Sequence, residues 1–348
     1  VGSGGGMGTQ VVIEAENQVA VFAYFDLILD HMARVRKATT CARIVLESNP
    51  ANCSAVTDAH LDKIINLMVE GSARYSWYID VLLSLARGLP DADSKSALKI
   101  MRKMLGPANG FLLVLYSGTA GRERRARELA AQQLDSSKLV GETGMVAFHH
   151  ALVQLFAELS SGLNNEVEML VQSIIPLHEV CAHICDAFCP YAIRASFFVL
   201  LVESYTVTAL KVQTLVQSPA IWQVLAIFNS ELRSILESIA NHGDEEDAKQ
   251  SALKLQPSMK GPSFIEAGLW FCITFLHKHA AIDTLQADHK SCLYFLERVS
   301  KRLINIEKAR DRAAIDRNAG KRPAINPDRE TNNVIERDSR QFNGKGER

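Results

Sequence analysis

The feature that most constrains this chain is the stretch from Met145 to Glu231, where amphipathic helical patterns follow one another without a strand signal. Glycine and proline interrupt these patterns and predict helix ends at Ser161-Gly162, Pro176, Cys189-Pro190 and Ser218-Pro219. A helix that is apolar on one side cannot bury that side alone, so these helices must pack on one another. The clearest stripes are Phe148, Leu152, Leu155, Phe156 and Leu159; Val167, Leu170, Val171 and Ile174; and Val180, Cys181, Ile184 and Phe188.

The same periodicity covers most of the remaining chain. One helix should start at Thr57 or Asp58, since both residue types cap helix N-termini. Phe111–Tyr116 is the one strand-like run, and it is short enough to be a buried helical turn instead. Residues 118–139 read as a polar loop with a helical piece over 122–133. The helix capped at Thr57 or Asp58 should extend to residue 70. The other predicted helices cover 11–36 as one long helix, 41–49, 77–87, 94–105, 220–241, 263–280 and 285–306.

Helix pairs recur at about 40 residues, the spacing of armadillo and HEAT arrays. Together with the short connections, this predicts an all-α fold of the armadillo/HEAT-like α-solenoid type. The predicted organisation is a linker-like or cut end over 1–10, a first helical array segment over 11–140, a central array segment over 141–241, a polar connector over 242–262, a terminal helix pair over 263–306 and a charged, disordered tail over 307–348.

The overall charge and composition exclude some classes of function. The chain has 348 residues, 47% of them apolar, and a net charge of −1, which argues against nucleic acid as the main partner. Seven cysteines without dense spacing indicate reduced thiols in a cytosolic setting. No apolar run reaches the roughly 18–20 residues that span a bilayer. Because the chain opens with Val1 and a glycine-rich run, we expect it to be a fragment of a longer protein.

Several clusters could carry chemistry, and each has a plainer interpretation. Cys181, Cys185 and Cys189, with His178 and His183 nearby, could bind zinc, but they lack the C-x-x-C spacing and fit packing in a helix interface better. The adjacent His149 and His150 point in different directions on a helix, so one should be half-buried and the other exposed. The acidic run Asp244–Asp247 could attract calcium, yet it lacks the EF-hand spacing and indicates a flexible connector.

The densest basic run is Gly121–Arg127, which could touch an acidic partner or an inositol phosphate, although a solvated helix face is the more common outcome. Trp77, Trp222 and Trp270 lie in or beside apolar stripes and are expected in the core. Phosphate-binding, dinucleotide-binding and nucleophile-elbow motifs are absent from the sequence. We therefore predict that the chain is not an enzyme and has no catalytic, cofactor-binding or metal site.

The order of several short motifs resembles a known family. The motifs are the succession of helices and turns over Leu61–Tyr116, then Phe148-His149, Leu152-Val153-Gln154-Leu155, Gly162-Leu163-Asn164, Ile175-Pro176-Leu177, Tyr205, Ser218 and Ile221-Trp222, with Phe264–Ile304 following more weakly. This order is similar to the central helical region, of the RIH homology type, in inositol trisphosphate receptors, and ryanodine receptors share related segments. Leu163 stands where the family leads us to expect a basic residue, which suggests a distant relative.

The resemblance implies a cytosolic helical segment of a tetrameric, ligand-gated calcium-release channel in the endoplasmic reticulum or another internal calcium-store membrane. Such a segment lies between the ligand-binding region and the pore, transmits conformational change, and has the other domains and subunits of the channel as partners. It implies no ligand or ion site on any residue of this chain. Two alternatives stay open: a free-standing helical-repeat scaffold for protein interaction, and a metal-dependent enzyme built on the cysteine–histidine cluster.

Overall fold

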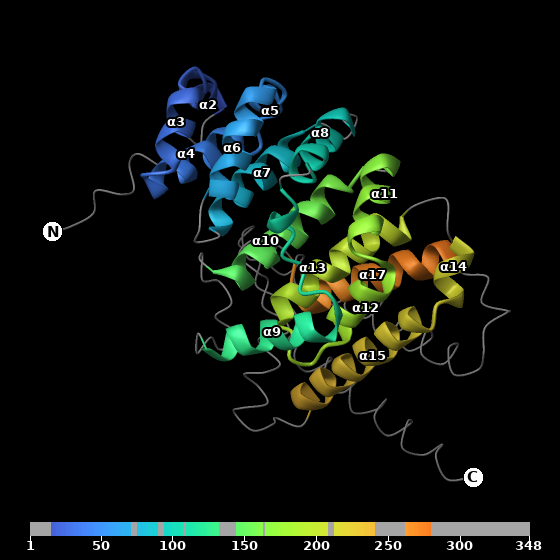
Figure 1. Ribbon diagram of the computed structural model, residues 1–348. Helices are drawn as coiled ribbons and strands as arrows, with labels where there is room; N and C mark the ends of the chain where they lie inside the picture. Colours follow the sequence, from blue (N-terminus) through green and yellow to red (C-terminus); the bar gives the residue numbers. More distant parts are fainter. Residues whose placement is uncertain are drawn as a thin grey trace, which may run out of the picture.

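The computed structural model describes residues 15–70, 75–89, 94–106, 109–131, 144–162, 164–207, 212–240 and 262–279 (Figure 1). All elements in these ranges are helical and none is a β-strand, so the all-α prediction is confirmed. The first half contains α2 (Ala15–Phe22), α3 (Phe25–Met32), α4 (Arg36–Leu46), α5 (Pro50–Ser54), α6 (Asp58–Glu70), α7 (Ser76–Gly88), α8 (Ser94–Met104), the 3-10 helix η1 (Gly110–Leu112) and α9 (Gly118–Ala131). The second half contains α10 (Met145–Leu159), α11 (Asn165–Ile174), α12 (Leu177–Cys185), α13 (Tyr191–Leu201), the π-helical turn η2 (Val202–Thr206), α14 (Val212–Gln217), α15 (Pro219–Ala240) and α17 (Phe264–His279).

Helix ends follow the local signals in the sequence. All four predicted breaks after Met145 fall between helices. The start of α6 is capped by Thr57, whose Oγ1 accepts a hydrogen bond from the His60 backbone N–H at 3.3 Å. In return the Thr57 N–H donates to His60 Nδ1 at 3.2 Å, so the histidine takes the place of the usual glutamate in a capping box. The Thr57 prediction is confirmed.

Two series of helix contacts organise the molecule. In the first, α4 packs on α7, α7 on α10, α10 on α13 and α13 on α17. In the second, α3 packs on α6, α6 on α8 and α8 on α11. Contacts of α3 with α4, α6 with α7 and α8 with α10 join the two series. Figure 1 shows the resulting progression from α2 and α3 at one end to α15 and α17 at the other.

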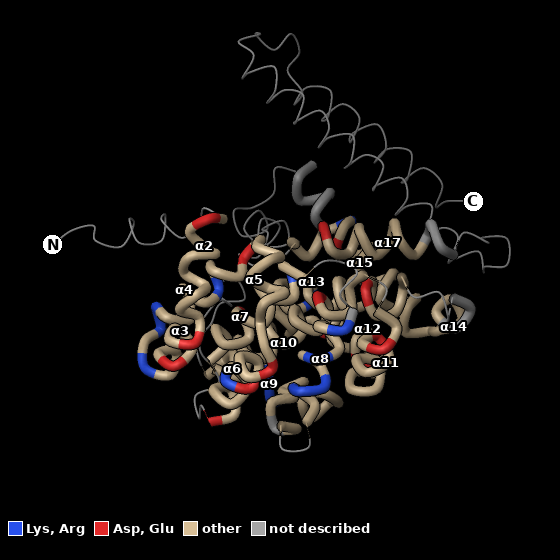
Figure 2. The backbone as a smooth tube through the Cα atoms, turned by 90° about the horizontal axis from the view of Figure 1, so that it is seen from above, with Lys and Arg blue, Asp and Glu red and all other residues tan. Residues whose placement is uncertain are grey.

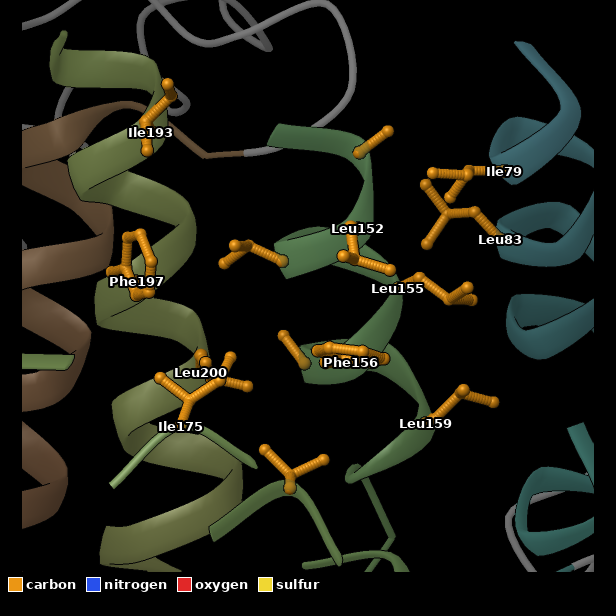
Figure 3. Packing of buried hydrophobic residues seen from close by; sticks show 14 of the residues in the cluster. Ile79, Leu83, Leu152, Leu155, Phe156, Leu159, Ile175, Ile193, Phe197 and Leu200 are labelled. Carbon is orange, nitrogen blue, oxygen red and sulfur yellow. The ribbon is translucent and has the colours of Figure 1, made fainter. Parts of the chain in front are cut away.

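Apolar packing holds the first series together. Helix α10 lies between α7 and α13, and its side chains face both neighbours (Figure 3). Leu152, Leu155 and Phe156 are fully buried there. The face toward α7 meets Ile79 and Leu83, and the other face meets α13. A helix whose two opposite faces are both covered needs apolar residues nearly all round, which the sequence of α10 supplies.

Ion pairs cross every junction of the second series. The pairs are Lys63 with Asp26 (2.8 Å) and Asp30 (2.9 Å), Lys99 with Asp58 (2.6 Å), Lys103 with Asp62 (2.5 Å), and Arg102 with Glu166 (3.2 Å). Figure 2 shows the acidic segments of α3, which itself carries no Lys or Arg, close to basic segments from other parts of the chain. These pairs are solvent-exposed and individually weak, so they favour one register between neighbouring helices more than they add stability.

The structure corrects the prediction of one long helix over 11–36. Within the described part of that range the chain forms α2 and α3, separated by a turn at Ala23-Tyr24. Phe22 and Phe25 stack across the turn, with ring centroids 5.0 Å apart. Val19 of α2 is 53% exposed, although the apolar spacing of one continuous helix over 11–36 would bury it. The sequence does not predict this break, because neither glycine nor proline stands at the turn.

Three further predictions were wrong in part. Phe111–Tyr116 contains the end of η1 followed by irregular backbone, so the strand alternative is excluded and only one 3-10 turn is helical. Helix α9 already begins at Gly118, not within a loop ahead of residue 122. Phe188 lies beyond the end of α12 and is 79% exposed. There the Phe188 N–H donates to Asp186 Oδ1 at 2.9 Å, an aspartate turn that replaces the next turn of helix.

Some predicted segments lie outside the described residues. These are the N-terminal 1–10, nearly all of the connector 242–262, the helix 285–306 and the tail 307–348. The predicted domain boundaries therefore stay predictions. No described helix combines the length and the apolar character that a membrane crossing requires.

Candidate functional site

The basic run Gly121–Arg127 forms part of α9, and most of its arginines form ion pairs with other residues of this chain. Arg122 pairs with Glu179 of α12 at 3.1 Å, and Arg124 pairs at 2.8 Å with Glu128, four residues further along the same helix. Arg125 is fully buried. The run is thus not a plain solvated helix face, and in this conformation most of its cations are not free for an acidic partner.

Arg125 binds two groups at the C-terminal end of α12. Its Nη2 donates to Asp186 Oδ2 at 2.5 Å, and its Nη1 lies 2.7 Å from His183 Nδ1. A guanidinium can only donate, so His183 Nδ1 must accept and the imidazole must be neutral with its proton on Nε2. Asp186 therefore supplies the countercharge, and His183 supplies a second acceptor for the buried cation.

His183 belongs to a cluster of buried rings. It stacks on Phe197 of α13 with centroids 4.3 Å apart and planes within 7°. His149 of α10 lies 5.7 Å from both rings, and Tyr116 meets His149 edge-on at 5.1 Å. The cluster joins α10, α12 and α13 beneath α9, so residues far apart in the sequence meet at one point.

His149 is also neutral in this arrangement. The Val114 carbonyl, 2.7 Å from Nδ1, can only accept, so Nδ1 carries the proton. Nε2 is buried without a hydrogen-bond partner among the described residues. Burial, and next the charge of Arg125, lower the pKa of His149 to about 3. Burial, then His149 and Arg125, lower the pKa of His183 to about 2.

Tyr116 adopts a strained conformation at the edge of this cluster. Its φ is 49°, in the left-handed region that bulky residues rarely occupy. The Tyr116 hydroxyl is hydrogen-bonded to Glu128 of α9, and burial raises its pKa well above the ordinary value. Gly121 of α9 lies against the Tyr116 backbone so closely that a Cβ would come within 2.4 Å of the carbonyl carbon. Such strain persists only where the surroundings hold it, here by the docking of α9.

A second polar site lies at the π-helical turn η2. Burial, then the charges of Glu158 and Glu168, raise the pKa of Glu203 to about 7. Gln172 of α11 ties the turn down by donating from Nε2 to the Ser204 carbonyl at 2.6 Å. Turns of this kind recur at functional sites in proteins. The acidic residue inside an otherwise apolar run was the signal in the sequence that could have singled out Glu203.

The cysteine–histidine cluster does not assemble as a metal site in the described residues. Cys181 and Cys185 lie on α12, whereas Cys189 follows the end of that helix, and all three are free thiols. Burial raises the pKa of Cys181 and Cys189 to about 12 and that of Cys185 to about 11, so each is a protonated thiol at neutral pH. Nowhere in the described ranges do three or more His, Cys, Asp or Glu side chains converge as metal ligands would.

Other sequence candidates have mixed outcomes. His149 and His150 are both buried, so the expectation of one exposed ring was wrong, and His150 Nε2 lies 3.0 Å from Ser196 Oγ. Trp77 and Trp222 pack against the core, whereas Trp270 is 39% exposed. The acidic run 244–247 lies outside the described residues.

The arrangement can hold charge and position helices. Arg125, Asp186 and the neutral imidazoles form a connected polar site under α9, assembled from side chains that the sequence does not place together. Compared with known protein families, the sequence matches no family model.

Proposed function

We propose that this chain is a regulatory and coupling segment of an intracellular, ligand-gated calcium-release channel similar to inositol trisphosphate receptors. The segment would carry conformational change between a ligand-binding region and a pore and perform no catalysis. Its place would be the cytosolic face of the endoplasmic reticulum or another internal calcium-store membrane. Its partners would be the other domains and subunits of a homotetrameric channel. Support comes from the ordered resemblance over Leu61–Ile304 and from the succession of helix contacts.

The proposal includes an armadillo- or HEAT-like α-solenoid. In such an array each unit contacts only its neighbours, so a small rotation at one end accumulates along the stack. The series α4, α7, α10, α13 and α17, alongside α3, α6, α8 and α11, supports this arrangement because each helix packs on the next.

The observation that carries the coupling role is the position of α10. Its opposite faces are packed against α7 and α13, and close-packed interfaces shift as units rather than deform continuously. A displacement of α7 must therefore be transmitted through α10 to α13. Ion pairs across the other series favour the same register on the outside.

The encoding transcript gives the first test. A downstream multi-span segment with a glycine-rich pore filter supports a channel, and a stop codon soon after Arg348 contradicts it. A second test replaces the homologous region of an inositol trisphosphate receptor with this chain and measures ligand-evoked calcium release.

Coupling itself is tested within that chimeric channel. Phe156→Leu loosens the α10 interface, so calcium release should fall while ligand binding is unchanged. Met169→Ala, on an exposed position of α11, is the matched control and should leave release unchanged. If Phe156→Leu lowers ligand binding and release together, or changes neither, the coupling role is wrong.

A free-standing interaction scaffold is the second candidate. It is favoured by the exposed large apolar side chains of α3 and its flanks, which are Tyr24, Leu27 and Val35. Recovery of a stoichiometric protein partner from a membrane-free fraction, lost on Leu27→Asp, supports this alternative over the channel segment.

A further inference from the structure

We propose that α9 is a releasable strap, held closed by ion pairs over the neutral pair His149 and His183 and opened by protons. The device lies within the described residues and does not depend on the proposed channel function. It follows from how α9 is attached, from what the attachment covers, and from the effect of a proton at that place.

Helix α9 is attached mainly through charge. Only Arg125 and Leu129 are buried in it, and the rest of the helix is polar or small. Glu179 of α12 receives two contacts from α9, from the Gly118 backbone N–H at 2.9 Å and from Arg122 at 3.1 Å. Arg125 reaches Asp186 one turn further on. Helix α9 therefore buries little apolar surface of its own, so its detachment costs less than that of a core helix, although it uncovers the rings beneath it.

The attachment requires His183 to be neutral. Nδ1 of this ring accepts from Arg125 at 2.7 Å. A proton on Nδ1 would remove that acceptor and place a second cation against the guanidinium. His149 must stay neutral for a different reason: a proton on its Nε2, which is buried without a partner among the described residues, would add an unpaired buried charge. The closed strap therefore excludes a second proton from both rings.

The groups that face the two rings come from every element packed around them. Arg122 and Arg125 on α9 oppose protonation, and so do the two histidines toward each other. His150 on α10 acts against His149 in the same direction. The carbonyls of Val114 and Leu115 act the other way, and Phe197 on α13 carries no charge. Burial outweighs the favourable groups in both cases.

The sign of the pH effect follows from this difference. With α9 closed, the pKa of His149 is about 3 and that of His183 about 2. Once α9 has opened and water reaches the rings, each should return toward an ordinary pKa of about 6.5. The closed form is thus fully favoured above about pH 6.5 and is disfavoured as the pH falls below it. For each histidine that becomes exposed, the opening constant rises about tenfold per pH unit.

Hydrogen exchange of the full 348-residue chain, read by mass spectrometry, tests the strap. Protection factors for peptides within 118–131 should fall about tenfold or more between pH 6.5 and 5.5, after correction for intrinsic exchange. Those of α10 and α13 should stay constant. Unchanged protection in α9, or an equal fall in α10 and α13, overturns the proposal, because the first means no opening and the second means general unfolding.

Two histidine variants separate the strap from other acid effects. His183→Gln keeps an acceptor for Arg125 but cannot take a proton. The change of α9 protection with pH should therefore be smaller than in the unaltered chain, by a factor of about ten for each pH unit. His178→Gln changes the exposed histidine on the same helix and should leave the dependence intact. Equal behaviour of both variants contradicts the proposal. Should His183→Gln fail to fold, deuterium exchange at the imidazole carbons of the unaltered chain gives the pH at which His183 becomes accessible, and protection maintained below pH 5 also rules the strap out.

Discussion

Arg125 lies in a different environment in the fold from the one that the sequence predicts. In the sequence it is one of four arginines in a polar run, and its default place is a solvated face. In the fold it is fully buried and bonded to Asp186 and His183. Removing water from a guanidinium is costly, so such a residue persists only where its partners replace the lost hydration.

The substitution Arg125→Met tests that requirement. It keeps most of the side-chain volume but leaves Asp186 without its cation, and breaking a buried pair from one side costs about 3–5 kcal/mol. We expect the lower part of this range, because Asp186 retains some solvent contact. Urea unfolding followed by circular dichroism measures the loss. Arg127→Ala, at an exposed position of the same helix, should change stability by less than about 0.5 kcal/mol, and a stable Arg125→Met variant would show that the pair is dispensable.

At the scale of elements, α15 and α17 approach each other more closely than ordinary side chains permit. A Cβ built on Gly268 of α17 would come within 2.2 Å of the Phe228 ring of α15. Phe228 is itself enclosed by Phe198 and Phe264, with centroids 5.4 and 5.7 Å away. Because the ring is 1% exposed and lies between these two rings, a Cβ at residue 268 would force it to shift, so the glycine is required by packing rather than by backbone conformation.

Gly268→Ala should therefore destabilise the protein by about 1–3 kcal/mol through overpacking. Gly110→Ala is the matched control, because a Cβ there meets no atom within 4 Å. In a Phe228→Leu background the cost of Gly268→Ala should be smaller, and a double-mutant cycle measured by chemical denaturation gives this coupling. Additive losses would mean that the two residues do not compete for the same space.

The π-helical turn gives a pH prediction of opposite sign to that of the strap. The pKa of Glu203 rises from an ordinary 4.5 to about 7 on folding. Between pH 4.5 and 7 the folded chain therefore keeps a proton on Glu203 that the unfolded chain has lost. Stability contributed by this group is therefore present below about pH 4.5 and is lost as the pH rises toward 7. Glu203→Gln should raise the free energy of unfolding at pH 8 by about 1–2 kcal/mol, allowing for partial solvent access.

Thermal unfolding at pH 5 and pH 8 measures this effect. The advantage of Glu203→Gln should nearly vanish at pH 5, where the native glutamate is already protonated. Glu70→Gln, at an exposed position at the end of α6, controls for the general loss of a carboxylate. If Glu203→Gln stabilises the protein equally at both pH values, the stabilisation does not arise from the titration of Glu203.

At the scale of the whole molecule, stability should be graded along the helix series. Helix α10 is covered on two sides by α7 and α13, whereas α2 and α3 have their main contacts with α4, α5 and α6 and expose several large apolar side chains. Amide exchange at pH 7 should therefore be slowest in α10 and α13 and fastest in α2 and α3. Uniform protection over all these helices would indicate one cooperative unit and no array behaviour.

Most helices and their ends could be predicted because those signals are local. The cap at Thr57 and the breaks at Pro176 and Pro190 act within a turn of the residues concerned. The turn at Ala23-Tyr24 could not be predicted, since it depends on how Phe22 and Phe25 pack against the helices beneath them. Phe188 was misplaced for a related reason, because the aspartate turn ended the helix before the apolar stripe did.

The candidate site was largely hidden from the sequence. Arg125, His149 and His183 were each visible as residue types, but their chemistry depends on meeting across α9, α10 and α12. Glu203 was overlooked because a carboxylate becomes unusual only once its neighbours and its burial are known. Charge in water and charge under a helix differ by several kcal/mol, and that difference arises from tertiary contacts alone.

The sequence by itself determined that this chain is helical, where most helices stop and that they must cover one another, because backbone preferences and apolar periodicity act over a few residues. Only the tertiary structure decided which helix lies against which, and so which charges are buried, which histidines are kept neutral and where the backbone is strained. Those properties depend on contacts between side chains that are far apart in the sequence, and local sequence patterns do not encode such contacts.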